Sequence, residues 1–122
     1  QHIINNEAIN RMKKNVILIN TSRGALIDTK ALINSLKLHL IAGACLDVYE
    51  EEAGVFFSDL SDSGINDDLL ARLLTFPNVL ITSHQAFLTH EALKNISDTT
   101  ISNISIFEAS GDLSKVQVKY SI

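Results

Sequence analysis

Three short apolar runs, separated by stretches with helical spacing, constrain the fold of this chain more than any other feature. The runs cover residues 16–19, 41–46 and 79–81. The first is continuous and rich in β-branched residues, which is typical of a strand covered on both faces. Because strands alternate with helical segments over short connections, we expect βαβ units and an α/β fold with a parallel sheet.

Four helical segments fit between and around these strands, and most of them carry a residue that can cap their start or end their last turn. The predicted helices are a short one capped by Asn6 and reaching Lys14, one capped by Asp28 that includes Leu36, one over residues 67–74, and a long one capped by Thr89 and ended by Gly111. One face of the long helix carries Leu93, Ile96, Thr100, Ile104 and Phe107. Residues 116–122 alternate weakly and could form an extra strand or a tail.

The composition is that of a globular domain and excludes several classes of function. The 122 residues are 46% apolar and 20% charged, which suits one domain with a core to bury. A formal net charge of −4 argues against nucleic acid as a partner, since such domains usually carry a basic surface. No apolar stretch reaches the roughly 18 residues that a membrane span needs, and no signal pattern opens the chain. Cys45 is the single cysteine, so an intramolecular disulfide is excluded and a cytoplasmic location is the default.

The start of the chain reads as the middle of a longer sequence. It lacks methionine and opens with Gln1-His2-Ile3-Ile4, in which an apolar pair runs directly into a helical pattern. We therefore expect these residues to have been cut out of, or truncated from, a longer polypeptide.

Three chemically distinct side chains follow the three predicted strands. Arg23 comes after the first strand, Glu52 lies in the acidic stretch after the second, and His84 comes just after the third. Since the carboxyl ends of parallel strands share one edge, where ligands bind in open α/β sheets, we expect these side chains to converge. A guanidinium can pair with a carboxylate through two hydrogen bonds, and an imidazole beside a carboxylate can carry a proton near neutral pH. The set is suited to holding an anion and moving a proton.

Simpler interpretations stay open for each of these residues taken singly. Arg23 could be a surface arginine in a turn, Glu52 a part of a solvated acidic run, and His84 a structural histidine. Asp47, at the end of the second strand, could bind a ribose hydroxyl or an amide, or could cap a turn. In the irregular segment that follows, the adjacent Phe56 and Phe57 are expected to pin the loop to the body of the domain.

Other chemistry at this edge is not expected. Ser22 lacks the flanking glycine pattern of a nucleophilic serine. A metal site drawn from His84, His90 and Glu91 lacks the spacing of a helical ligand pair. The chain also contains no G-x-G-x-x-G, the turn that binds pyrophosphate in a dinucleotide fold.

Three motifs resemble those of a known family in both order and interval. They are Asn20-Thr21-Ser22-Arg23-Gly24, Leu46-Asp47-Val48-Tyr49-Glu50 and His84-Gln85-Ala86-Phe87. With steps of 29 residues from Arg23 to Glu52 and 32 from Glu52 to His84, they resemble the D-isomer-specific 2-hydroxyacid dehydrogenases, most closely the fermentative D-lactate dehydrogenases. The resemblance runs from about His2 to about Gly111.

The resemblance implies a particular fold. Residues 1–88 would form the second half of a Rossmann-type doubly wound parallel sheet that binds NAD. Residues 89–122 would form a long C-terminal helix and a tail that return toward a substrate domain. The glycine-rich loop would lie upstream of Gln1, and the parent enzyme would be a homodimer.

The resemblance also implies roles for named residues. Arg23 would bind the carboxylate of a small 2-oxo acid such as pyruvate, His84 would protonate its keto oxygen, and Glu52 would orient the imidazole. The implied cofactor-binding residues are Asn20, Thr21, Ser22 and Asp47. The alternative is a truncated, non-catalytic α/β module or the product of a pseudogene.

Overall fold

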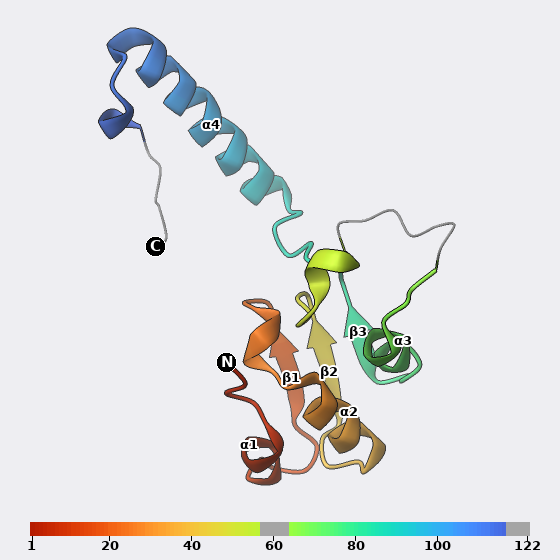
Figure 1. Cartoon of the computed structure of the whole chain (residues 1–122). Helices are drawn as coiled ribbons and strands as arrows, with labels where there is room; N and C mark the ends of the chain where they lie inside the picture. Colours follow the sequence, from red (N-terminus) through yellow and green to blue (C-terminus); the bar gives the residue numbers. More distant parts are fainter. Residues whose placement is uncertain (57–63, 117–122) are drawn as a thin grey trace. The chain divides into compact units, whose positions relative to one another are not determined.

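The computed structural model describes residues 1–56 and 64–116, and the chain forms two compact units, Gln1–Ala86 and Phe87–Ile122 (Figure 1). Phe57 and residues 117–122, which include most of the expected C-terminal strand or tail, lie outside the described residues. In the described part, the first unit carries a parallel sheet with helices α1 to α3, and the second carries the long helix α4. The role of the second unit as a return toward a substrate domain stays a prediction.

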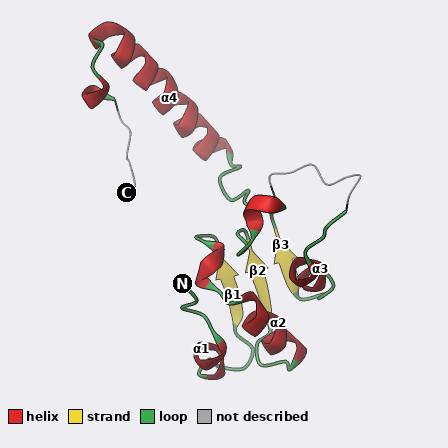
Figure 2. Cartoon of the chain, in the orientation of Figure 1, coloured by secondary structure: helices red, strands yellow, loops and turns green. Residues whose placement is uncertain are grey.

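The sheet of the first unit contains three parallel strands in the order β1-β2-β3 (Figure 2). The strands are Ile17–Asn20, Gly43–Leu46 and Val79–Ile81. They confirm the three apolar runs as strands and the α/β fold class. Asn20 lies beside Leu46, and Leu46 lies beside Ile81, so all three strands end at the same level.

Side-chain caps begin the helices α2, α3 and α4; the sequence predicts those of α2 and α4, whereas Asp67, predicted as the first residue of α3, is its cap. In α2, Thr29–Lys37, the Asp28 carboxylate accepts a hydrogen bond from the Ala31 amide at 3.0 Å. In α3, Asp68–Leu74, Asp67 accepts from two amides of the first turn. Such caps satisfy amide groups that have no partner inside the helix, each contributing about 1 kcal/mol.

The prediction for the first helix is wrong at both ends. Helix α1 covers Asn6–Asn10, and its cap is Asn5, whose side chain accepts from the Ala8 amide at 3.0 Å. Asn5 is extended at φ −126°, so Asn6 is already the first helical residue. The helix stops before Lys14 because the amide of Arg11 bonds the Ala8 carbonyl, three residues back, which tightens and ends the last turn.

The core lies between one face of the sheet and the helices α2 and α3. Leu32 and Leu36 of α2 and Leu73 of α3 are fully buried, and they belong to one cluster with Ala44 and Leu46 of β2. Burying a leucine side chain contributes roughly 1.5–3 kcal/mol, so this cluster is the main source of stability in the first unit. Packing of α2 and α3 on the sheet therefore holds its strand ends in place.

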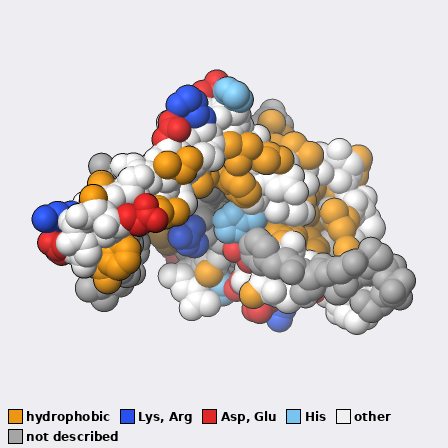
Figure 3. Space-filling view, turned by 90° about the horizontal axis from the view of Figure 1, so that it is seen from above, with side chains coloured by type: hydrophobic (Ala, Val, Ile, Leu, Met, Phe, Trp, Pro, Cys, Tyr) orange, Lys and Arg blue, Asp and Glu red, His pale blue; other side chains and the backbone are white. Residues whose placement is uncertain are grey.

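The opposite face of the sheet differs from the prediction of a strand covered on both faces. Ile17 and Ile19 of β1 are 57% and 71% exposed, and Leu80 of β3 is 58% exposed. A right-handed crossover places its helix on a fixed side of the sheet, and both crossovers step in the same direction. Helices α2 and α3 therefore share one face, and within residues 1–56 and 64–116 the other face keeps apolar side chains at the surface. Figure 3 shows patches of hydrophobic side chains on the exterior of the molecule.

The second unit consists of helix α4, His90–Ser110, followed by a 3₁₀ turn at Leu113–Lys115. The Thr89 hydroxyl oxygen accepts from the Ala92 amide at 3.1 Å, and Gly111 ends the helix in the left-handed conformation at φ 63°. These contacts confirm Thr89 as the predicted cap of the helix and Gly111 as its predicted end. None of the residues of α4 is buried. No helix in the described ranges is long and apolar enough to cross a membrane.

We expect Leu73→Ala to lower the free energy of unfolding of the protein by about 2–5 kcal/mol, because it leaves a cavity in the core. The matched control is Leu74→Ala, since Leu74 is the next residue of the same helix but is 54% exposed, whereas Leu73 is 0% exposed. The control should cost less than about 1 kcal/mol. Urea denaturation followed by circular dichroism measures both variants, and equal losses for the two would contradict this assignment of the core.

Candidate active site

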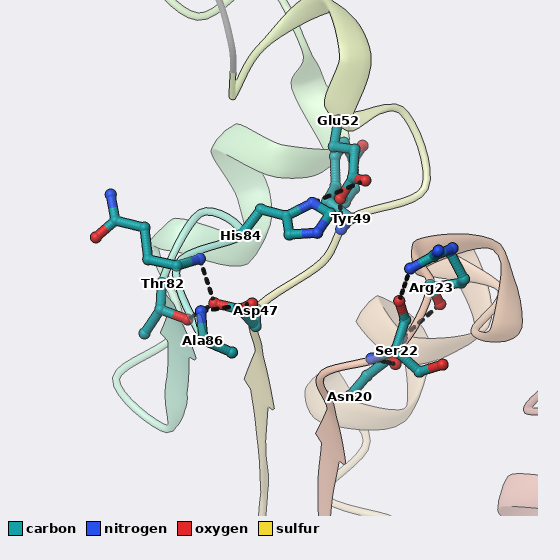
Figure 4. A network of polar contacts seen from close by, with 10 residues as sticks. Asn20, Ser22, Arg23, Asp47, Tyr49, Glu52, Thr82, His84 and Ala86 are labelled. Carbon is teal, nitrogen blue, oxygen red and sulfur yellow. Dashed lines mark hydrogen bonds and ion pairs between the residues drawn. The ribbon is translucent and has the colours of Figure 1, made fainter. Parts of the chain in front are cut away.

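The three candidate catalytic residues follow the carboxyl ends of three adjacent strands. Arg23 lies in the turn after β1, Glu52 starts a 3₁₀ turn in the segment after β2, and His84 lies in the loop after β3. Figure 4 shows His84 directed toward Glu52, with Arg23 in the turn at the end of the neighbouring strand. The structure thus gathers at one sheet edge residues that are far apart in sequence.

His84 and Glu52 form an ion pair. The His84 Nδ1 atom lies 3.2 Å from Glu52 Oε1, and both side chains are partly buried. The other carboxylate oxygen of Glu52 accepts from the Tyr49 amide at 3.0 Å, so the carboxylate is held from two sides. A carboxylate at Nδ1 fixes the orientation of the ring and favours a proton on that nitrogen.

Arg23 is exposed, and its guanidinium donates to the Ser22 carbonyl at 2.8 Å. Thr21 and Ser22 are exposed beside it. The turn is built by Asn20, which is buried: its amide donates to the Arg23 carbonyl at 2.9 Å and accepts from the Ser22 amide at 3.2 Å. Asn20 therefore shapes the turn that presents Arg23.

Gly24 lets this turn lie against the segment after β2. A Cβ atom at Gly24 would sit 2.0 Å from the Tyr49 carbonyl oxygen, which no real side chain permits. A glycine in a turn at a strand end can let the backbone approach a ligand closely. The close approach in the structure is to the chain's own backbone, and it brings the Arg23 turn beside the segment that carries Glu52.

Asp47 is buried and accepts three hydrogen bonds from the loop after β3. Its Oδ1 atom accepts from the Thr82 hydroxyl at 2.5 Å and from the Gln85 amide at 2.8 Å, and its Oδ2 atom accepts from the Ala86 amide at 3.0 Å. Burial by itself would raise the pKa of Asp47, but these hydrogen bonds and the nearby His84 charge outweigh it, and the pKa is lowered. The group is therefore a carboxylate at neutral pH.

The three glutamates after β2 occupy three different environments. Glu52 holds His84, Glu51 is exposed, and Glu50 bonds both His2 and Thr29. The Glu50 Oε1 atom lies 2.5 Å from His2 Nε2, and its Oε2 atom accepts from the Thr29 hydroxyl at 3.0 Å. Burial would raise the pKa of Glu50, but the hydrogen bonds and charge of these partners lower it.

Sequence reasoning missed the roles of His2, Thr29 and Thr82, because their partners lie far along the chain. Glu50 could have been singled out from the sequence, since it belongs to the motif Leu46-Asp47-Val48-Tyr49-Glu50. Its neighbours in sequence, however, do not distinguish its environment from that of Glu51. The prediction that the phenylalanine pair pins the loop is met by Phe56, which packs against the core with its ring 6.2 Å from that of Tyr49. The other member, Phe57, is outside the described residues.

Comparisons with known proteins agree on a family. Residues 1–86 match the family model of the NAD-binding domain of D-isomer specific 2-hydroxyacid dehydrogenases. The chain is 53% identical over 107 residues to 2-hydroxyacid dehydrogenase A of Aspergillus oryzae, covering 88% of this chain and 31% of that protein. It is 50% identical over 107 residues to the D-lactate dehydrogenase of Escherichia coli, covering 88% and 32%.

Solved structures give the same result. The D-lactate dehydrogenase of Lactobacillus jensenii, determined with NAD⁺, superposes on this chain with a TM-score of 0.85 at 33% identity, over 100% of this chain and 36% of that one. The chain therefore spans about a third of the length of the relatives that it matches.

We expect the protein to lose stability on the acid side, and Glu50→Gln to reduce this dependence on pH. Because the pKa of Glu50 is lowered in the folded state, its stabilisation is complete above the ordinary value of 4.5 and is lost as the pH falls through the folded value. Denaturant midpoints measured from about pH 6 to about pH 3 test this. The exposed Glu51→Gln is the matched control, and identical slopes for Glu50→Gln and the unchanged protein would refute the assignment.

Proposed function

The chain belongs to the D-isomer specific 2-hydroxyacid dehydrogenase family, and on this premise we propose that it supplies the catalytic side chains of an NAD-dependent D-lactate dehydrogenase. The whole protein would interconvert pyruvate and D-lactate. The observation that carries the proposal is the ion pair of His84 with Glu52, at the same sheet edge as Arg23. An acid held in place by a carboxylate, at the same sheet edge as a cation that can bind an anion, is what reduction of a 2-oxo acid requires.

The edge also suits the nicotinamide end of NAD. Thr21 and Ser22 are exposed in a polar turn at the end of β1, in an open parallel sheet whose strand ends form the usual site for such ligands. We propose that the cofactor is held by this turn, which Asn20 builds, and by Asp47, which follows the neighbouring strand β2. When bound in its reduced form, NADH, the cofactor would supply the hydride, which is its own chemistry.

Each catalytic residue then has a defined task. Arg23 binds the carboxylate of the 2-oxo acid and orients its keto group. His84, protonated, gives its proton to the keto oxygen as that oxygen becomes a hydroxyl. Glu52 holds the ring through Nδ1, so that the opposite nitrogen is the one that exchanges a proton with substrate. A positioned acid of this kind is worth about 10² to 10⁴-fold in rate.

The 122 residues alone are proposed to be inactive. They contain no G-x-G-x-x-G for the pyrophosphate, and they correspond to about a third of the related enzymes. We also propose that the parent enzyme is a homodimer and that it is located in the cytoplasm.

A non-catalytic module is the second candidate, and one observation favours it. The sheet face that carries Ile17, Ile19 and Leu80 is apolar and exposed in the described residues, as expected of a piece that lacks its covering elements. Assay of the intact protein, meaning the longer polypeptide of which these residues would form a part, separates the two candidates. Only the enzyme oxidises NADH when pyruvate is added.

We expect His84→Ala in the intact protein to lower kcat for pyruvate reduction by about 10² to 10⁴-fold, because the proton donor is lost. The control is His39→Asn, since His39 is exposed and left-handed at φ 51°, a conformation that asparagine tolerates. The control should retain kcat. Steady-state NADH oxidation measures both variants, and an unchanged rate in His84→Ala would remove the histidine from the mechanism.

We expect Arg23→Lys to raise KM for pyruvate by about tenfold or more, because an ammonium cannot form the paired hydrogen bonds of a guanidinium. The matched control is Arg11→Lys, since Arg11 is an exposed arginine that pairs only with Glu7 among the ion pairs of the described residues. The same NADH assay over a range of pyruvate concentrations gives KM. A value for Arg23→Lys within about twofold of the unchanged protein would argue against carboxylate binding by this residue.

A further inference from the structure

The loop after β3 has a backbone that requires support. Ser83 and His84 are consecutive and both left-handed, at φ 53° and φ 58°. Residues other than glycine rarely adopt this conformation, and they hold it only where surrounding contacts enforce it. The direction in which the His84 side chain leaves the backbone is therefore set by whatever holds residues 82–86.

Asp47 accepts four hydrogen bonds from this loop. Its carboxylate accepts from the Thr82 hydroxyl before the left-handed pair and from the amides of Gln85 and Ala86 after it. Its main-chain carbonyl accepts from the His84 amide at 2.5 Å. One residue thus bonds both sides of the left-handed pair and the backbone of His84 itself. Figure 4 shows the Asp47 side chain beside Thr82 and Ala86.

Two residues that hold His84 belong to the segment that follows β2. Glu52 holds the imidazole ring at 3.2 Å, and Asp47 holds the backbone from which the ring projects. Two fixed points, one on the ring and one on the main chain, leave the side chain little freedom to rotate. Such control matters because a misplacement of about 1 Å can cost about 10²-fold in rate.

We propose that Asp47 is a positioning residue for the proton donor, and that Thr82 acts with it. This inference rests on the proposed function, and it assigns Asp47 a task beyond contact with the cofactor. The carboxylate oxygens are already engaged by three donors of the chain's own loop. A change at Asp47 therefore acts on the placement of His84 and on kcat, in addition to any effect on the affinity for NADH.

The test uses substitutions that remove single acceptors or donors from this network in the intact protein. Asp47→Asn keeps the shape of the side chain but replaces one of the two acceptor oxygens with an NH₂ group. That group is a donor, and it faces a donor of the loop with which it cannot form a hydrogen bond. Thr82→Val removes only the hydroxyl, and Thr82→Ser restores it. The matched control is Asp28→Asn, which changes another carboxylate that accepts from a backbone amide, at the start of α2.

We expect Asp47→Asn to lower kcat for pyruvate reduction by about 10²-fold and Thr82→Val by about tenfold, with KM for NADH within about twofold in Thr82→Val. Thr82→Ser and Asp28→Asn should keep kcat within about twofold. Amide hydrogen exchange of the segment 82–86 should accelerate in Asp47→Asn and Thr82→Val and stay unchanged in the other two. This second readout tests the anchoring of the loop without any activity.

Other outcomes overturn the inference, and they are distinguishable from failure of the proposed function. A raised KM for NADH with unchanged kcat in Asp47→Asn would make Asp47 a cofactor contact only. Unchanged exchange in both Asp47→Asn and Thr82→Val would show that the loop does not depend on this carboxylate. If the unchanged protein fails to oxidise NADH with pyruvate, the proposed function itself is wrong, and so is the assignment of Asp47 to its proton donor.

Discussion

The parallel register of three short strands is the constraint on which the rest of the structure depends. Asn20, Leu46 and Ile81 lie side by side, so the chain leaves all three strands at the same level. The segments that follow carry the guanidinium of Arg23, the carboxylates of Asp47 and Glu52 and the imidazole of His84. A slip of one strand by a single residue would reverse its side-chain faces and separate these groups. The buried leucines of α2 and α3 hold this register from one face of the sheet.

The segment after β2 organises the candidate site, because it contacts both neighbouring strand ends. Asp47 bonds the loop after β3, and Glu52 bonds the histidine in that loop. On the other side, Glu50 bonds His2 and Thr29, and the Tyr49 backbone lies against Gly24 in the Arg23 turn. Carboxylates that are buried or partly buried and hydrogen-bonded in this way hold their positions firmly, since losing one partner leaves an unsatisfied group.

Local patterns in the sequence predicted most of the fold, because strands and helix caps depend on neighbouring residues. The three apolar runs became β1, β2 and β3, and the caps Asp28 and Thr89 begin helices as expected. The prediction for α1 failed by one residue at its cap, where two adjacent asparagines offer similar chemistry. The prediction that both faces of β1 are covered also failed. The face that a helix covers depends on the crossover between strands, and no local run of residues encodes that choice.

The sequence by itself determined the strands, the parallel class and three side chains placed after strand ends, since periodicity and spacing follow from the chain alone. Only the tertiary structure decided how these side chains are held. The hydrogen bonds of Asp47 to residues 82–86, the pairing of Glu52 with His84, and the contact of Gly24 with Tyr49 all join segments that are distant in sequence. Such contacts depend on distance in the folded chain, which the order of residues does not specify.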